Sequence, residues 1–397
     1  MYATLLGMGQ RLLINWVYYH PIGHAMEAYR AAQAFRNSNP DMHIAVALNA
    51  RTAIELASCV PAVDAVYPIA VDDVTSLADA HRAIVAVPRD WDYVYADPRQ
   101  CAPMGSEALD LIAQAVRSSV RTGLINDGWD TPDGYPPHHL TPLALDLPED
   151  ATRFAQGFVS PEATARISLL LGAGSDANRT PPLAFWRALI GHLVAGFPGV
   201  EIVLLGALGG GRTVTSGLER SAIDALVRAS PAVRDAFDLG LLNQLAIARC
   251  CDLHISPHTG MAFAIQAVGV PWLALAGGEI HEAVLNGVPF VSVYTDCPRY
   301  PCGPWFDPIK NAMLPDCQAR RGTARPFLCM TGERLTARLP DILRAARVLI
   351  EGNLSYQECA RAHYQALLPR LGADEGTPIF FDWPRVMDED FVFPKQA

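Results

Sequence analysis

Short apolar runs alternate with amphipathic segments along most of the chain. In the first half the apolar runs are β-prone and predict strands, while the segments between them carry apolar residues at helical spacing and predict helices. The predicted strands are 12–18, 43–48, 66–69, 92–96 and 121–125, and the predicted helices are 25–36, 51–58 and 107–118. Strands that alternate with helices in this way are typical of a parallel sheet covered on both faces.

The same pattern begins again in the second half. The predicted strands there are 166–171, 201–205, 253–256, 272–276 and 290–294, and the predicted helices are 183–195, 218–230, 243–250, 282–286, 341–352 and 356–371, with another from about residue 261. A stretch rich in Pro, Gly and His follows residue 127, so we place a domain boundary between about 127 and 160. We therefore predict an α/β chain of two doubly wound, Rossmann-like domains, 1–150 and 151–355, with a helix and tail at 356–397 that packs back on the protein.

The most informative stretch is 252–271, which reads DLHISPHTGMAFAIQAVGVP. An apolar strand runs into a Pro-His-Thr-Gly turn, and a helix follows. The first-turn N–H groups of a helix have no acceptor within it and attract anions. Doubly wound sheets bind ligands at the carboxyl ends of their strands, and two such domains bind them in the cleft between. We therefore predict that nucleotide phosphates bind at His258, Thr259, Gly260 and Met261.

Two glycine-containing turns follow other predicted strands, GAGSDANR at 172–179 and GALGGGR at 206–212. Neither is the G-x-G-x-x-G of dinucleotide-binding enzymes, and the chain has no G-x-x-x-x-G-K-[ST] phosphate loop. Each turn has two interpretations: a flexible connection, or a close approach of the backbone to a nucleoside with an arginine placed for phosphate. The second interpretation assigns Gly174, Arg179, Gly206 and Arg212 to the donor site.

The composition narrows the class of protein. Half of the 397 residues are hydrophobic and 18% are charged, which favours large cores over disorder. The net charge is −10 and no long Lys/Arg run occurs, so a nucleic-acid partner is not expected. No apolar run reaches the roughly 20 residues of a membrane span, and the N-terminal stretch lacks the basic start of a signal peptide. We expect a cytoplasmic protein with reduced cysteines, and leave its oligomeric state open, a homo-oligomer included.

Residues 166–271 resemble the family 9 glycosyltransferases, the group of ADP-heptose:lipopolysaccharide heptosyltransferases. Arg179 stands near a lysine of that family, Trp186 near its tryptophan, and IVLLGALGG matches its VVLLGGP-like strand. The family signature, roughly N-D-[ST]-G-P-M-H-L-A-A-A-L-G-x-P, aligns without a gap with PHTGMAFAIQAVGVP. The matching residues are Thr259, Gly260, Ala267, Gly269 and Pro271. The signature Asp is His258 in this chain, and the signature His is Phe263.

The resemblance implies a fold and an activity. The fold is GT-B, in which the C-terminal domain binds the nucleotide-sugar and the N-terminal domain binds the acceptor. The activity is inverting, metal-ion-independent transfer of a sugar, in this group a heptose, from an ADP-heptose-like donor to a hydroxyl. An acidic residue of a Gly-Asp pair is the base in the family, and the pair here is Gly23-His24. Imidazole titrates near working pH and can replace it. His24 is thus either the base or a structural histidine, and His20 is a weaker candidate.

Four cysteines lie close together in the sequence, at C-x4-C-x14-C-x11-C spacing. They are Cys297, Cys302, Cys317 and Cys329. Four thiolates can bind zinc or iron, although the spacing lacks the tight C-x2-C pair and unligated thiols are the alternative. This segment resembles an autotransporter heptosyltransferase subgroup that holds iron on four cysteines. The resemblance implies a structural metal at 297–329.

Three functions remain open at this point. The first is a glycosyltransferase whose acceptor is a glycan, a protein or a small molecule. The second is another GT-B enzyme, such as a sugar-nucleotide epimerase, which would need additional acid and base groups in the same cleft. The third is a catalytically degenerate binding or partner subunit, which the loss of the Gly-Asp pair and of the signature histidine favours.

Overall fold

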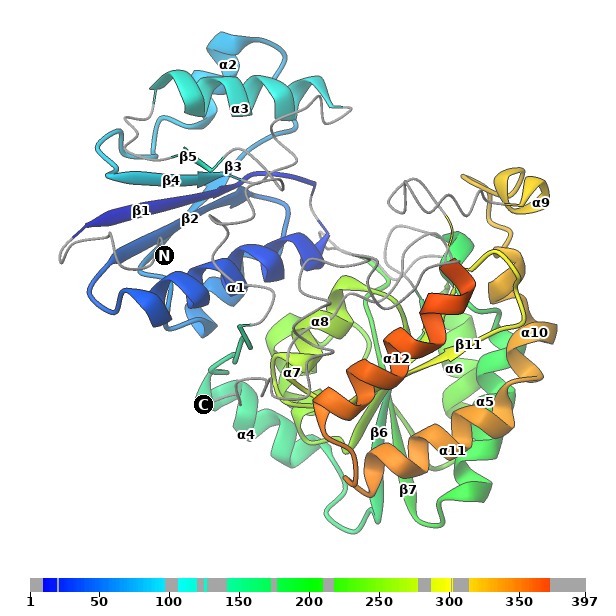
Figure 1. Ribbon diagram of the computed structural model, residues 1–397. Helices are drawn as coiled ribbons and strands as arrows, with labels where there is room; N and C mark the ends of the chain where they lie inside the picture. The colour runs from blue at the N-terminus through cyan, green and yellow to red at the C-terminus, as the bar shows by residue number, and fades with distance from the viewer. Residues whose placement is uncertain are drawn as a thin grey trace. The chain divides into compact units, whose positions relative to one another are not determined.

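The computed structural model separates into two compact units, Met1–Asp146 and Leu147–Ala397 (Figure 1). It describes residues 10–19, 21–96, 106–119, 125–126, 141–172, 177–209, 218–277, 287–300, 302 and 314–371. Each unit contains one parallel β-sheet with helices on its faces, so the predicted α/β class with two sheets is confirmed. Within the described residues, none of the helices combines the length and the apolar character that a membrane crossing requires.

The first unit is built on a five-stranded sheet in the order β3-β2-β1-β4-β5. The strands are β1 (Arg11–Trp16), β2 (His43–Asn49), β3 (Ala65–Ile69), β4 (Tyr93–Ala96) and β5 (Ile125–Asn126). The helical elements are α1 (Ile22–Ser38), the 3-10 helix η2 (Ile54–Cys59), α2 (Leu77–Ala83) and α3 (Glu107–Ser119). Helix α1 covers one face, and α2 and α3 cover the other (Figure 1). Strand β1 is central and buried along nearly its whole length, which rigidly fixes the residues at its carboxyl end.

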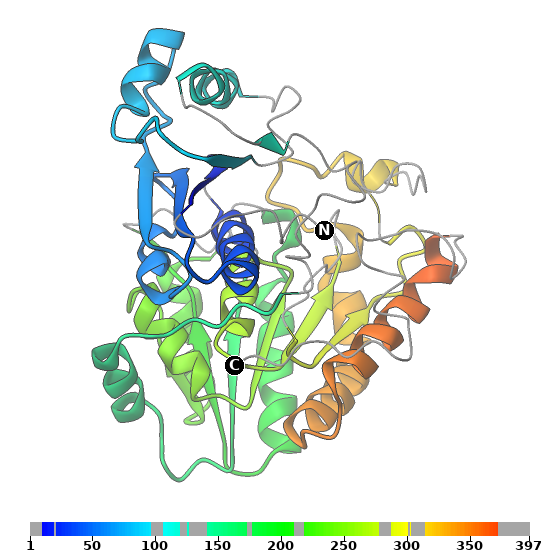
Figure 2. The ribbon, with the colours of Figure 1, turned by 60° about the vertical axis from the view of Figure 1, so that its left-hand side comes forward.

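The second unit has a six-stranded sheet in the order β11-β10-β9-β6-β7-β8. The strands are β6 (Ala165–Leu170), β7 (Val200–Leu205), β8 (Val233–Asp235), β9 (Leu253–Pro257), β10 (Trp272–Ala276) and β11 (Phe290–Tyr294). The helical elements are α4 (Glu149–Phe158), η5 (Ala177–Arg179), α5 (Leu183–Gly196), α6 (Arg220–Ala229), α7 (Leu241–Arg249), α8 (Gly260–Gln266), α9 (Pro315–Gln318), η7 (Leu328–Met330), α10 (Gly332–Thr336), α11 (Leu339–Ile350) and α12 (Tyr356–Leu371). Helices α5 and α11 lie on the opposite side of this sheet from α7 and α8 (Figure 2).

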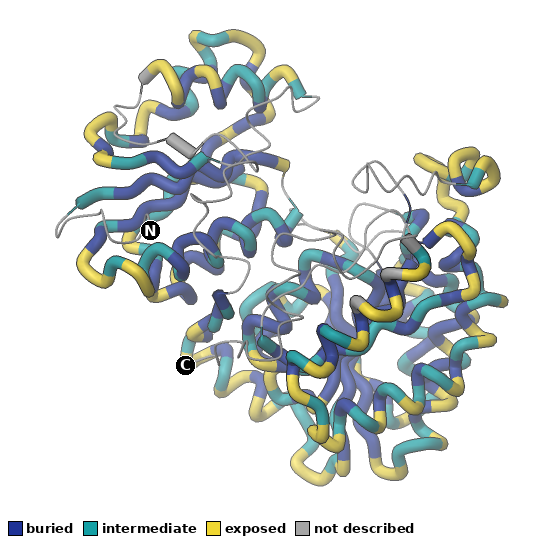
Figure 3. Tube along the Cα trace, in the orientation of Figure 1, coloured by how far each residue is buried: buried dark blue, intermediate teal, exposed yellow. Residues whose placement is uncertain are grey.

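The cores explain why the central strands read as continuous apolar runs. In the second unit, Trp186 and Leu189 of α5 and Ile342 of α11 pack on strand residues such as Ile255 and Leu273. The strands are buried, whereas the outer faces of the helices are exposed (Figure 3). Burying one such large apolar side chain contributes about 1.5–3 kcal/mol, so each sheet forms a stiff platform for its loops.

Each sheet has a point where the strand order reverses. In the first unit the chain proceeds from β1 outward to β2 and β3, then returns to place β4 on the other side of β1. In the second unit it proceeds from β6 to β7 and β8, then returns to place β9 on the other side of β6. The loops that leave two such strands diverge and form a crevice at their carboxyl ends, which is where doubly wound sheets bind ligands.

Several elements differ from the sequence predictions. The segment expected as a helix at 51–58 is the 3-10 helix η2, and α2 and β8 were not expected. Part of the stretch assigned to the boundary region forms α4, which begins after Pro148 and carries Glu149 and Asp150 in its first turn. Those are helix-start signals that the surrounding Pro and Gly residues obscured. The helix predicted at 282–286 and the tail at 372–397 lie outside the described residues.

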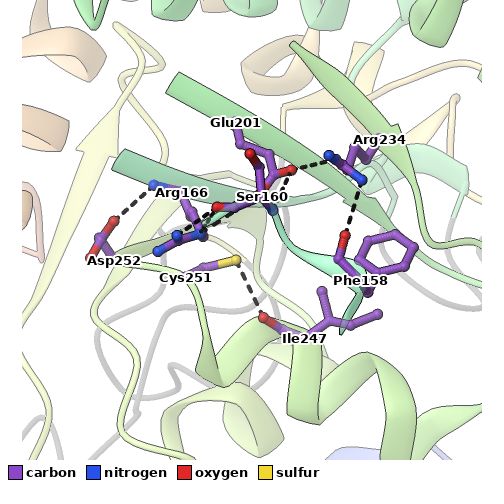
Figure 4. Close-up of polar contacts among 8 residues, drawn as sticks. All are labelled: Phe158, Ser160, Arg166, Glu201, Arg234, Ile247, Cys251 and Asp252. Atoms are coloured by element: carbon purple, nitrogen blue, oxygen red, sulfur yellow. Dashed lines mark hydrogen bonds and ion pairs between the residues drawn. The ribbon is translucent and has the colours of Figure 1, made fainter. Parts of the chain in front are cut away.

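At the amino ends of the second sheet, one buried carboxylate joins the strands to the segment after α4 (Figure 4). The backbone N–H of Ser160 donates to both oxygens of Glu201, each at 3.0 Å. Arg234 and Arg166 form ion pairs with the same carboxylate, and Arg166 also donates to the Ser160 carbonyl oxygen at 2.6 Å. Glu201 is 4% exposed, so these contacts are shielded from water. Nearby, burial raises the pKa of the Cys251 thiol, which therefore packs as a neutral group.

Replacing Glu201 with alanine is expected to lower the free energy of unfolding by about 2 kcal/mol, because charge-assisted hydrogen bonds to Ser160 are lost in a buried setting. Urea denaturation followed by tryptophan fluorescence measures the change. The control is Glu149→Ala, which removes an exposed pair with Arg153 and should cost at most about 0.5 kcal/mol. Equal effects of the two substitutions would show that burial of Glu201 does not matter.

Candidate functional site

The predicted base of the first unit lies at its switch point. Helix α1 starts soon after β1, and His24 is in its first turn. The His24 side chain is 24% exposed, and its Nδ1 lies 3.3 Å from Oε2 of Glu27. Its ring meets the Tyr18 ring edge-on, with centroids 4.8 Å apart. His24 is thus a partly exposed imidazole held from two sides, whereas His20 lies outside the described residues.

Two of the predicted donor residues meet at the switch point of the second unit. Arg179 ends η5, which follows β6, and His258 directly follows β9. Burial, and secondarily the Arg179 charge, lower the pKa of His258 to about 3. His258 is therefore neutral at physiological pH, and Arg179 supplies the positive charge at this point. An arginine beside two diverging loops suits a phosphate-bearing ligand.

The two residues that depart from the family signature contact each other. The rings of His258 and Phe263 pack edge-to-face with centroids 5.2 Å apart. Trp272 of β10 lies behind them, with its ring 6.3 Å from that of His258. Together the substitutions place a neutral aromatic pair where the signature has an acidic residue and a histidine. The electrostatic character of this position consequently differs from that of the signature.

Thr259 shapes the start of α8. Its backbone is extended, and its Oγ1 accepts a hydrogen bond from the Ala262 N–H at 3.2 Å, so it is the N-cap of the helix. This cap uses a lone pair of the hydroxyl and leaves its proton available for donation. The N–H groups of Gly260 and Met261 belong to the first turn, where helices provide no internal acceptor. The segment can thus donate hydrogen bonds to an anion beside Arg179.

The turn at Gly206 is held from inside the protein. The Gly206 N–H donates to Oε1 of Gln244, and Nε2 of Gln244 donates to the Gly206 carbonyl oxygen, both at 2.9 Å. The same carbonyl accepts from the Asp238 N–H at 3.0 Å. The N–H and carbonyl groups of Gly206 are thus already bonded to α7 and to the turn before it. A nucleotide-sugar could therefore contact this residue only by packing against it, not through these backbone groups. Gly174 and Arg212 lie outside the described residues.

Sequence reasoning missed Asn178, which precedes Arg179 and is 3% exposed. Its Nδ2 donates to the carbonyl oxygens of Arg320, Thr323 and Arg325 at 2.6–2.9 Å, and its Oδ1 accepts from the Gly322 N–H at 3.1 Å. Asn178 thereby fastens the 320–325 loop next to Arg179. No motif marks it, because its partners are more than 140 positions away.

A buried polar pair connects the two switch-point strands. Nδ1 of His254 on β9 lies 3.0 Å from Oγ of Ser168 on β6. His254 is fully buried, and burial lowers its pKa to about 3, so the ring is neutral in the folded protein. Among the described residues, its Nε2 has no hydrogen-bond partner. The pair lies within the sheet, below the candidate site. Between about pH 3 and 6.5 the His254 ring is neutral in the folded protein but protonated in the unfolded chain.

The four late cysteines are all buried. Cys317 accepts a hydrogen bond at its Sγ from the Leu328 N–H at 3.4 Å, and Cys329 lies beside Gly277 at the end of β10. In the described part of the chain, which includes all four, no group of three or more His, Cys, Asp or Glu side chains could hold a metal ion. The iron or zinc site that we predicted from the sequence is therefore not shown by the structure.

Comparison with known proteins shows the fold. No protein-family model matches the sequence, and a sequence search of curated proteins finds no match. A family 9 glycosyltransferase from Veillonella parvula superposes with a TM-score of 0.54 at 12% identity, over 87% of this chain and 98% of that protein. The ADP-heptose lps heptosyltransferase II of E. coli gives 0.52 at 14% identity, over 85% and 99%. The predicted GT-B fold and the resemblance to family 9 are confirmed as a likeness of fold.

Proposed function

We propose that the protein is a glycosyltransferase that moves a sugar from a nucleotide-sugar to an acceptor hydroxyl, and that this sugar is a heptose. The observation that carries the proposal is the meeting of Arg179, His258 and the Thr259 cap at the β6/β9 switch point. A cation and several N–H or O–H donors converge there, as a diphosphate requires. The likeness of fold to two family 9 proteins supports the same function.

On the donor side, the work of the protein is to stabilise the leaving group. As the bond from the anomeric carbon to the diphosphate oxygen breaks, negative charge grows on the diphosphate. Arg179 and the Thr259 hydroxyl would hold that charge, and neutral His258 would add none of its own. We propose that these groups suffice without a metal ion, and that attack on the opposite face inverts the anomeric carbon.

On the acceptor side, His24 would act as the base. The attacking hydroxyl must lose its proton as the sugar passes through an oxocarbenium-like state. An imidazole at the β1/β4 switch point of the first unit can take that proton, and its partial exposure leaves room for an acceptor. The acceptor would be a hydroxyl of a glycan, a protein side chain or a small molecule.

The direct test is product analysis by mass spectrometry. The purified protein is incubated with a panel of nucleotide-sugars, ADP-heptose first, with and without candidate acceptors. Transfer to an acceptor with release of the nucleoside diphosphate supports the proposal. Conversion of the nucleotide-sugar without an acceptor would instead identify an epimerase, and tight binding without any turnover would identify a degenerate binding subunit.

Replacing Arg179 with alanine is expected to weaken the binding of ADP about tenfold, because one charge-assisted hydrogen bond to phosphate contributes about 1.5 kcal/mol or more. Isothermal titration calorimetry with ADP measures the change. The matched control is Arg187→Ala, which removes an exposed arginine from α5 of the same unit and should leave the affinity unchanged. Unchanged ADP affinity in the Arg179 variant would remove this residue from the donor site.

A further inference from the structure

Glu27 of α1 receives hydrogen bonds from two different elements. Nε1 of Trp16, the last residue of β1, lies 3.2 Å from Oε2 of Glu27, and Nδ1 of His24 lies 3.3 Å from the same oxygen. Trp16 is 4% exposed and its ring stacks on Tyr95 of β4 at 5.7 Å. One carboxylate oxygen thus connects His24 to the rigid centre of the sheet, across the β1/β4 switch point.

This geometry determines where the proton of the His24 ring resides. The indole Nε1–H can only donate, and an ionised carboxylate can only accept. Nδ1 of His24 must therefore carry a proton to bond with Glu27. In the neutral ring, Nε2 is then the nitrogen with the lone pair, the one able to act as a base. A histidine without such a partner distributes between both tautomers, so Glu27 selects one.

A simple ion pair on the helix surface would not have these properties. A pair one turn apart such as Arg344 and Asp341 of α11 joins two residues of the same helix. Glu27 is in addition fixed by Trp16, which belongs to the sheet, and the His24 ring is packed against Tyr18. Two contacts of the ring, to Glu27 and to Tyr18, therefore define the orientation of the imidazole, and the bond from Trp16 fixes Glu27 to the end of β1.

We propose that Glu27 is the positioning residue of His24, an inference that rests on the proposed role of His24 as the base. Glu27 holds the Nδ1–H tautomer and directs Nε2 to the acceptor hydroxyl. In the reaction the hydroxyl O–H bond breaks and an Nε2–H bond forms. The oxygen electron pair makes the new bond to the anomeric carbon while the bond to the diphosphate breaks. The Glu27 carboxylate stabilises the imidazolium until its proton passes to water.

The test uses a readout that needs no substrate. The full chain is labelled with ¹⁵N-histidine, and two-bond ¹H–¹⁵N spectra at pH 8.5 report the tautomer of each neutral ring, with His24 assigned from its loss in His24→Ala. The expected result is Nδ1–H for His24 in the unmodified protein. Glu27→Leu should shift the ring toward Nε2–H, and Glu27→Gln, which keeps an acceptor oxygen and the length of the side chain, should retain Nδ1–H. Glu55→Gln, an exposed change in the same unit, is the control and should alter nothing.

Transfer assays complete the test. Glu27→Leu should lower the rate about tenfold or more without changing ADP affinity, and Glu27→Gln should recover part of it. An Nε2–H tautomer in the unmodified protein, or an unchanged tautomer and rate in Glu27→Leu, would overturn the inference. If the tautomers behave as expected but His24→Ala transfers sugar normally, the positioning by Glu27 is upheld and the proposed base is wrong. Should Glu27→Leu fail to fold, a transfer rate in Glu27→Gln equal to that of the unmodified protein at every pH would still refute the role of the negative charge.

Discussion

Replacing His24 with alanine is expected to lower the rate of sugar transfer by about 10²–10⁴-fold, the range that general base catalysis contributes. The loss should appear in kcat, because the acceptor hydroxyl keeps its proton as the transition state is approached. ADP affinity should not change, since the donor residues belong to the other unit. Steady-state assays with a saturating nucleotide-sugar, together with calorimetry of ADP binding, separate these effects.

The control for this experiment is His81→Ala. His81 belongs to α2 of the same unit and has no part in the proposed reaction. It should transfer sugar at the normal rate. If both alanine variants are equally active, His24 is a structural histidine, and the base must be sought elsewhere in the first unit.

Acidification from pH 8 to 4.5 is expected to lower the free energy of unfolding of the second unit by about 3 kcal/mol through protonation of His254 alone. The folded-state pKa of this buried ring is about 3, and an unfolded histidine has a pKa of about 6.5. Between these values the unfolded chain binds the additional proton. The stabilisation is therefore complete above pH 6.5 and is lost progressively as the pH falls toward 3. His258 has a pKa lowered in the same direction, but it is only half-buried, so we assign the effect mainly to His254.

Urea titrations at a series of pH values measure this effect. The informative quantity is the difference in slope between the unmodified protein and His254→Asn, because titrating carboxylates contribute equally to both. The slope should fall by up to about 1.4 kcal/mol per pH unit in the variant. His192→Asn, an exposed change on α5, should retain the original slope. If plots of unfolding free energy against pH are parallel for all three proteins, His254 has the same pKa in the folded and unfolded states.

Periodicity was sufficient to predict most of the strands and helices. Strand β7 is apolar apart from Glu201, and α11 repeats its apolar residues at helical spacing, so local sequence specified both. The same reasoning failed for α4, because the Pro- and Gly-rich residues before it suggested a continuous linker. It also failed for η2, whose short 3-10 turns carry no periodic signal.

The candidate site was less predictable than the fold, because its contacts join distant positions. The strand-turn-helix stretch around Thr259 could be found from its own residues, including the cap. By contrast, the bond from Trp16 to Glu27 depends on how α1 packs on β1. The contact between His258 and Phe263 likewise appears only once α8 is folded. A four-cysteine spacing, finally, was compatible with a metal site but did not determine where the thiols would lie.

The bonds from Asn178 to the 320–325 loop have a practical consequence for protein engineering. Three carbonyl oxygens of the loop accept hydrogen bonds from a side chain that is distant in the sequence. A chimaera that exchanges 314–331 with another sequence would therefore need to exchange position 178 as well. Residues 314–331 and position 178 must therefore be exchanged together. If the loop alone were exchanged, carbonyl groups next to Arg179 would lose their hydrogen-bond donor.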